Sequence, residues 1–304
     1  MPQPEFLDGP TLSAGARVAT TLGDVLVEEL VPGDAVLLAG GHVGELAAVV
    51  EHRPAGVIRI GPGALAANRP RRGLAIEATQ CVLLSDDPDG LGALASVPAA
   101  LLVNCRNVWS EAPAGRLFRL VLKRRPARRS AAVIVEGVPV AAPRPAGAQA
   151  ALGRIRAAVD AGAGVIPGLL TGFIDGVTPT HIAGWARDEA NPGVPVLLSF
   201  SADGRRCGMA LANLPRADLA DACGFVLALP EKLDPALPHA VAARRATDGA
   251  ELYATLAVIP GAITIAQRLR ALEAEAPVAR AHNAAFLIDQ IARLRRGRSV
   301  PVAG

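Results

Sequence analysis

Cysteine and histidine are two side-chain types in this sequence that could act as nucleophiles, proton carriers or metal ligands. The chain has four cysteines and five histidines: Cys81, Cys105, Cys207, Cys223, His42, His52, His181, His239 and His282. No two cysteines form a CxxC pair, and the histidines show no HxH or HExxH spacing, so we predict no metal site. No histidine lies near Cys81 or Cys105 in the sequence, and free cysteines are commonly buried. We therefore expect inert, buried thiols in a reducing compartment, and no cofactor.

Length and composition indicate a globular protein of about two domains. Hydrophobic residues make up 51% of the 304 residues but aromatic residues only 3%, so Ala, Val, Leu and Ile must fill the cores. The 31 basic and 28 acidic residues leave a net charge of +3, which is too even to indicate a nucleic-acid partner. Arginine clusters at Lys123–Arg129 and Arg293–Arg298 are interpreted as solvated loops.

Neither a secretory signal nor a membrane span is expected. The first ten residues, MPQPEFLDGP, lack a basic segment followed by an apolar one. No stretch supplies the roughly 18 uninterrupted apolar residues that a spanning helix needs. We therefore expect a cytoplasmic protein. Secretion by a route that needs no signal peptide is the alternative.

The first half of the chain has the pattern of an all-β domain. Short runs rich in Val, Ile and Leu, separated by Gly, Pro, Asp and Asn, extend from Arg17 to about Val140. Leu22–Asp24 is placed as a hairpin turn would be, and Val31–Asp34 (VPGD) has Pro and Gly where a tight turn needs them. We predict a β domain over residues 1–143.

The rest of the chain divides into three parts. Ala- and Arg-rich spacing over residues 144–167 predicts a helical linker, and strand runs around two Asp-Gly turns, at Asp203 and Asp248, predict a β-sandwich over 168–260. Residues 261–304 show amphipathic helical spacing, interrupted at Pro277. Such helices need a partner surface, so a homo-oligomer joined through them is one possibility. The fold class is mainly β.

Six blocks of the first half, in order, carry a family resemblance. They are Thr11–Thr20 (TLSAGARVAT), Val27–Asp34 (VEELVPGD), Ile58–Pro70 (IRIGPGALAANRP), Ile76–Leu83 (IEATQCVL), Val97–Val108 (VPAALLVNCRNV) and Val135–Pro139 (VEGVP). Together they resemble the bacterial Hint domains of the hedgehog/intein superfamily. This resemblance implies an all-β self-processing fold over residues 11 to about 142.

The same resemblance implies that the chemical residues of the family have been replaced. In the family, an N-terminal cysteine attacks the preceding carbonyl and a histidine protonates the departing nitrogen. Here the nucleophile position falls on Thr11, a secondary alcohol with no evident base. The family's Asp and His positions hold Thr79 and Gln80, and Arg119 stands in a strand where the family often has a histidine. Neither Thr79 nor Gln80 can cycle a proton near neutral pH.

The second half more loosely resembles a β-sandwich module attached to bacterial glycosyltransferases, with GWARD at Gly184–Asp188. The resemblance implies Trp185 as the core ring, Asp188 as a turn former, and Arg216 with Asp218 as a structural pair. Structural roles are favoured for these four residues over ligand binding.

Three functions remain open. The first is a degenerate Hint protein without autoprocessing, acting as a non-catalytic recognition or assembly scaffold for a protein or glycan partner. The second is a self-cleaving protein in which Thr11 attacks Pro10. The third is a carbohydrate-binding accessory protein of the bacterial envelope. Whether the chain is an enzyme is therefore uncertain, and the replaced residues lean against it.

Overall fold

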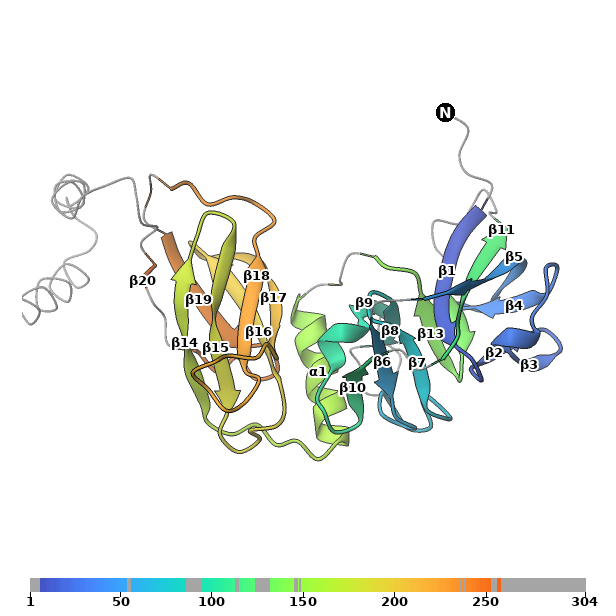
Figure 1. The fold of residues 1–304 in the computed structure, drawn as a ribbon, viewed down its shortest axis with the longest axis horizontal. Helices are drawn as coiled ribbons and strands as arrows, with labels where there is room; N and C mark the ends of the chain where they lie inside the picture. The colour runs from blue at the N-terminus through green and yellow to red at the C-terminus, as the bar shows by residue number, and fades with distance from the viewer. Residues whose placement is uncertain are drawn as a thin grey trace, which may run out of the picture. The chain divides into compact units, whose positions relative to one another are not determined.

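The structure, a computed structural model, describes residues 6–53, 56–85, 94–112, 115–123, 132–144, 147, 149–235, 237, 239–252 and 256–257. The expected mainly β fold class is confirmed (Figure 1). Residues 6–144 form the N-terminal β region, and residues 168–257 form the C-terminal β region. Both regions belong to one compact unit that includes residues 6–233 and 239–257. The C-terminal helices expected over 261–304 lie outside the described residues.

The N-terminal β region contains a single antiparallel sheet. Its strands are β1 (Phe6–Ser13), β2 (Arg17–Thr20), β3 (Gly23–Leu26), β4 (Ala35–Leu38), β5 (His42–His52), β6 (Val57–Ile60), β7 (Leu74–Glu77), β8 (Cys81–Ser85), β9 (Leu94–Pro98), β10 (Val108–Glu111), β11 (Leu117–Lys123), β12 (Ala132–Val135) and β13 (Val138–Ala141). Two short 3-10 helices, η1 (Val27–Glu29) and η2 (Ala99–Leu102), interrupt them. The strand order is β10-β6-β7-β1-β11-β5-β4-β2-β12-β13-β8-β9, with β3 on β2.

The predicted turns form where the sequence places them. Thr20 pairs with Gly23 at the end of the β2–β3 hairpin, so the Leu22–Asp24 segment does reverse the chain. In the VPGD turn the amide of Asp34 donates to the carbonyl of Val31, and the Asp34 carboxylate accepts from the amide of Val31 at 2.9 Å. Gly33 has φ +99°, a conformation that glycine adopts with little strain.

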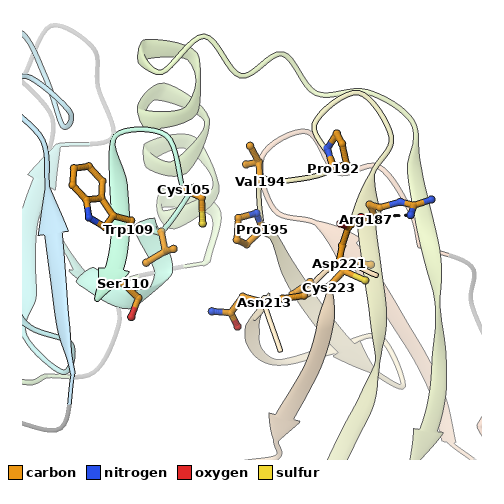
Figure 2. A pocket seen from close by; sticks show the side chains of 15 residues that line it. Cys105, Trp109, Ser110, Arg187, Pro192, Val194, Pro195, Asn213, Asp221 and Cys223 are labelled. Carbon is orange, nitrogen blue, oxygen red and sulfur yellow. Dashed lines mark ion pairs between the residues drawn. The ribbon is translucent and has the colours of Figure 1, made fainter. Parts of the chain in front are cut away.

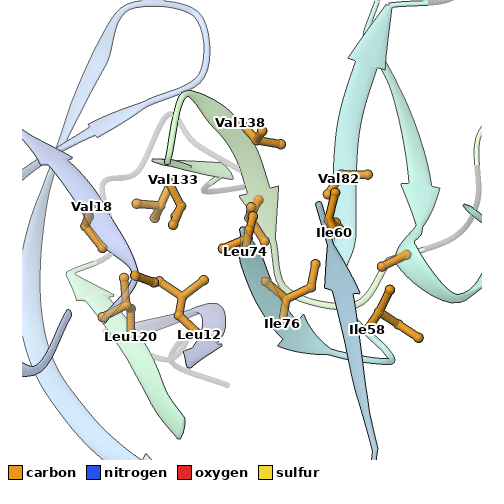
Figure 3. Close-up of a cluster of buried hydrophobic side chains, with 14 of the residues drawn as sticks. Leu12, Val18, Ile58, Ile60, Leu74, Ile76, Val82, Leu120, Val133 and Val138 are labelled. Atoms are coloured by element: carbon orange, nitrogen blue, oxygen red, sulfur yellow. The ribbon is translucent and has the colours of Figure 1, made fainter. Parts of the chain in front are cut away.

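The core of the N-terminal β region consists of aliphatic side chains from strands far apart in the sequence (Figure 3). Leu12, Leu74 and Leu120 come from β1, β7 and β11, and each is 0% exposed. Burial of a side chain of this size stabilises a fold by about 1.5–3 kcal/mol. An aliphatic core therefore meets the expectation drawn from the low aromatic content.

Helix α1 (Gln149–Gly162) follows the N-terminal β region, where the Ala- and Arg-rich spacing predicts a helix. Its apolar residues Leu152, Ile155 and Val159 are buried in the same core. They recur at intervals of three and four, which puts them on one face of the helix. The helix is thus a packed part of the compact unit.

The C-terminal β region has two sheets around a common core. One contains β14 (Leu170–Val177), β15 (His181–Asp188) and β18 (Gly224–Ala228), in the order β14-β15-β18. The other contains β16 (Val196–Ala202), β17 (Arg205–Ala212), β19 (His239–Arg245) and β20 (Leu256–Ala257), in the order β17-β16-β19-β20. The predicted turn at Asp203 joins β16 to β17, with Asp203 and Gly204 both at positive φ. No helix among the described residues is long and apolar enough to cross a membrane.

The core rings of this region are Phe200 and Phe225, whose centroids lie 5.1 Å apart. The expectation that Trp185 is the core ring is wrong, because Trp185 is only partly buried. Side chains alternate across a strand, and in β15 the buried positions are Ile182, Gly184, Ala186 and Asp188. Trp185 therefore lies on the opposite, outward face of its sheet.

Candidate functional site

Thr11, at the position of the family's nucleophile, lies in strand β1, directly after an irregularity in its pairing with β11 between Asp8 and Thr11. It is 0% exposed and sits opposite Arg119 in the antiparallel β1–β11 pairing. Its hydroxyl Oγ1 is buried and has no hydrogen-bond partner among the described residues. A hydroxyl can attack a carbonyl only when a base accepts its proton, so Thr11 has no activated oxygen in this arrangement.

Gln80 and Thr79 occupy the turn between β7 and β8, and they differ in environment. Thr79 is exposed, whereas Gln80 is 2% exposed. The Gln80 amide Nε2 lies 3.5 Å from Glu77 Oε2, and its oxygen Oε1 has no partner among the described residues. A carboxamide does not exchange protons near neutral pH, so Gln80 cannot act as the general acid.

His52 and Glu77 form a polar cluster with Arg119 that the sequence did not reveal. His52 Nε2 lies 3.3 Å from Glu77 Oε1, and Arg119 Nη2 lies 3.2 Å from His52 Nδ1. The His52 ring thus lies within hydrogen-bond distance of one carboxylate and one guanidinium. The partners lie 25 and 67 positions away in the chain, so local spacing held no signal for the cluster.

The same cluster shares a face of the sheet with Thr11. Directly opposite residues in antiparallel strands project to one face, as Thr11 and Arg119 do. Leu12 pairs with Ile76, so their neighbours Thr11 and Glu77 occupy adjacent positions on that face. Thr11 and Arg119 are therefore neighbours, and Gln80 reaches the same group through Glu77, whereas the Thr79 side chain is exposed. The imidazole present there belongs to His52 and is already engaged by a carboxylate and a guanidinium.

The four cysteines are all unpaired, and they differ in burial. Cys81 and Cys223 are buried, as expected, and Cys207 is partly buried, with burial raising the pKa of the Cys207 thiol. The expectation of burial is wrong for Cys105, which is exposed in a turn after Asn104. Cys105 has φ +54°, so the tight reversal of the backbone turns its side chain away from the core. Within the described ranges, no group of three or more His, Cys, Asp or Glu side chains is placed to hold a metal ion.

The four candidate residues of the C-terminal β region fall into two groups. Asp188 is 5% exposed and accepts hydrogen bonds from the amides of Gly168 and Ala190. Its Oδ2 also pairs with Arg245 at 2.6 Å, so Asp188 fixes a turn at the end of β15. Trp185, Arg216 and Asp218 instead come together on the outward face of the β14–β15–β18 sheet. Gly224, the β18 partner of Trp185, lies under the Arg216 side chain.

A cavity of about 300 Å³ borders β15 at Ala186 and Arg187 (Figure 2). Val103, Trp109 and Pro195 contribute apolar walls, and Arg187 with Asp221 borders the cavity on the side of β15. Cys105 and Cys223 also line it. Its volume lies at the lower end of the range for small-ligand pockets.

Comparison with known proteins concerns the N-terminal β region. The family model described as Hint domain matches residues 10–140. Two solved structures are similar: a crystal structure of the gp41-1 intein, at 9% identity and TM-score 0.29, and a solution structure of a bacterial intein-like domain from Clostridium thermocellum, at 12% identity and TM-score 0.30. Each alignment covers 44% of this chain and 98% of the other. No curated protein matches the sequence. The family match therefore shows a Hint domain at residues 10–140, from the second half of β1 into β13.

Proposed function

We propose that this protein uses its Hint domain as a non-catalytic recognition or assembly scaffold and does not cleave its own backbone. The observation that carries the proposal is the Thr11 hydroxyl, which is fully buried and has no acceptor for its proton among the described residues. The acid position supports it as well, because Gln80 cannot protonate a leaving nitrogen. A scaffold role also fits the way in which one buried arginine, Arg156, bonds to both β regions.

Self-cleavage is the second candidate, and one specific observation favours it. His52 and Glu77 share a face of the sheet with Thr11. In this reaction Thr11 Oγ1 would bond to the carbonyl carbon of residue 10, the C–N bond to Thr11 would break, and the Thr11 nitrogen would take up a proton. The product is an ester, which hydroxylamine cleaves to release residues 1–10.

Intact mass spectrometry of the full-length chain separates the two candidates. We expect an unchanged mass after incubation with thiol or with hydroxylamine. A product lacking residues 1–10, lost in both Thr11→Ala and His52→Gln variants, would overturn the proposal and establish self-cleavage. Ser13 lies two residues after Thr11 on the same strand, so the Ser13→Ala variant is a control that should leave either outcome unchanged.

Restoring the family residues tests whether the two replacements explain the inactivity. Thr11→Cys supplies a thiolate nucleophile, and Gln80→His supplies an imidazole. We expect the double variant to release residues 1–10 on addition of thiol, and each single variant to stay intact. A folded double variant that remains intact would show that the replaced residues are not what prevents the reaction.

A further inference from the structure

The outward face of the β14–β15–β18 sheet carries an accessible pair of aromatic rings. Phe173 and Trp185 are cross-strand partners, with ring centroids 5.9 Å apart and planes inclined by 58°. Phe173 is 50% exposed, and Val226, on the neighbouring strand, is 52% exposed. We call Phe173, Trp185 and Val226 the aromatic face. In a chain with only 3% aromatic residues, two rings placed together outside a core are a conspicuous use of them.

Two ion-pair clusters flank the aromatic face. Arg187 lies 2.8 Å from Glu189 and 3.7 Å from Asp221, and Arg216 contacts both Asp175 and Asp218. Each guanidinium is thus held by two carboxylates, and four carboxylates with two guanidinium groups leave two negative charges in excess.

Two of these carboxylates, those of Glu189 and Asp218, have lowered pKa values and are accessible. Hydrogen bonds from Thr171 and then Arg187 lower the pKa of Glu189, and the Arg216 guanidinium lowers the pKa of Asp218. The Asp218 side chain is 62% exposed and the Glu189 side chain 38%. Their oxygens can therefore still accept hydrogen bonds from a ligand.

We propose that the aromatic face binds a basic peptide, with an arginine or lysine side chain of that peptide lying on the Trp185 ring. A cation over an indole is attracted by the negative face of the ring, and more strongly where water is displaced. The excess negative charge on both sides complements further cations of the same peptide. A neutral sugar could stack on the rings, but it would leave this charge unmatched.

An extended peptide fits the site better than an isolated cation. Arg187 and Asp221 belong to one of the flanking clusters and also border the cavity of about 300 Å³ (Figure 2). A peptide that follows β15 past Arg187 can therefore place an apolar side chain beside Val194 and Pro195. This inference goes beyond the proposed function and does not depend on the chemistry at Thr11.

Tryptophan fluorescence gives a direct test, because the chain has only two tryptophans. In the full-length Trp109→Phe variant, Trp185 is the sole reporter. We expect a saturable change on titration with the hexapeptide RGRGRG, weakening about tenfold or more between 50 and 300 mM salt as the charges are screened. The uncharged QGQGQG and a neutral hexasaccharide should cause no saturable change. Equal binding of QGQGQG, or binding of the hexasaccharide alone, would overturn the proposal.

Substitution of the carboxylates tests the charge argument. In the Trp109→Phe background, Glu189→Gln with Asp218→Asn should weaken RGRGRG binding about tenfold. Glu231→Gln is the control variant. The Glu231 side chain is an 81% exposed carboxylate of the same region, and it too lies within ion-pair distance, 3.9 Å, of an arginine, Arg205. Equal binding by the two variants would contradict the proposal. Trp185→Leu, followed by calorimetry, should abolish binding while leaving the thermal unfolding midpoint within a few degrees of the parent, and unchanged binding would contradict the assignment of the ring.

Discussion

Arg156 and Asp160, one turn apart on α1, form an ion pair inside the protein, with Arg156 Nε 2.8 Å from both carboxylate oxygens. The arginine is 1% exposed, and its two remaining nitrogens donate to the carbonyl oxygens of Leu101 and Pro195 at 3.0 and 2.8 Å. One side chain therefore satisfies backbone groups of both β regions. Asp160 in turn accepts from Asn104 at 3.1 Å.

Removing this arginine should strongly destabilise the protein. Arg156→Met leaves the Asp160 carboxylate buried without its cation, which costs about 3–5 kcal/mol. Urea unfolding followed by circular dichroism measures the loss. Arg106→Met, at an exposed position two residues after Asn104, should change the free energy of unfolding by no more than about 0.5 kcal/mol. Similar losses in both variants would contradict a special role for Arg156.

Two glycines of α1 should respond in opposite ways to alanine. Glycine in a helix usually costs about 1 kcal/mol relative to alanine. At Gly153, however, an added Cβ would lie 2.1 Å from the backbone oxygen of Ala246, so Gly153→Ala should destabilise the protein. Gly162 has nothing within 4 Å of that position, and Gly162→Ala should be neutral or slightly stabilising. Thermal unfolding midpoints distinguish the two, and a raised midpoint for Gly153→Ala would show that α1 does not pack against Ala246.

Glu111 should make part of the stability depend on pH. A hydrogen bond from Arg59, at 2.9 Å from its Nε, holds the pKa of Glu111 below its usual 4.5, and desolvation only partly opposes this. A lowered folded-state pKa gives stability that is present above 4.5 and is lost as the pH falls through the folded value. Glu111→Gln should therefore be less stable than the parent at pH 6, by urea midpoint, and this difference should shrink as the pH falls from 6 to 3. A difference that stays constant from pH 6 to pH 3 would be inconsistent with this pairing.

Cys105 should be the first thiol to react in the folded protein. It is the exposed one of four free cysteines, while burial raises the pKa of Cys223 and so reduces its thiolate fraction. Brief treatment with iodoacetamide should add one carbamidomethyl group, and peptide mapping should find it at position 105. The Cys105→Ser variant should show no fast addition. Early labelling of Cys81 would contradict its placement in the core.

Turn chemistry made much of the fold predictable. The Asp-Gly pair at Asp203 has the positive φ values that a tight hairpin demands, and few other residue pairs adopt them without strain. Strand β1 was missed because its sequence, FLDGPTLS, combines Gly and Pro with an irregular register between Asp8 and Thr11. Its place in the sheet is fixed by β11, more than a hundred residues later, and local pattern carries no information about that pairing.

The candidate sites were predictable to a smaller extent. The outward position of Trp185 could have been predicted from the alternation of side chains along β15. Trp185 lies an even number of residues from the polar His181 and Arg187, so all three side chains project from the same face of the sheet. The grouping of Trp185 with Arg216 and Asp218 could not, because it depends on the return of β18 beside β15. The same holds for His52, whose partners reach it only through the pairing of distant strands.

The residues before Thr11 are part of the sheet, because they pair with β11. In this antiparallel pairing Phe6, Leu7 and Asp8 lie opposite Lys123, Leu122 and Val121. The residues on both sides of the bond between positions 10 and 11 therefore belong to the same sheet. A self-cleaving Hint domain has to stay folded after it loses the residues that precede its nucleophile. Here the loss of residues 6–8 would leave one edge of β11 unpaired and would expose Leu120 and Leu122 to water. Cleavage before Thr11 would therefore destabilise the sheet.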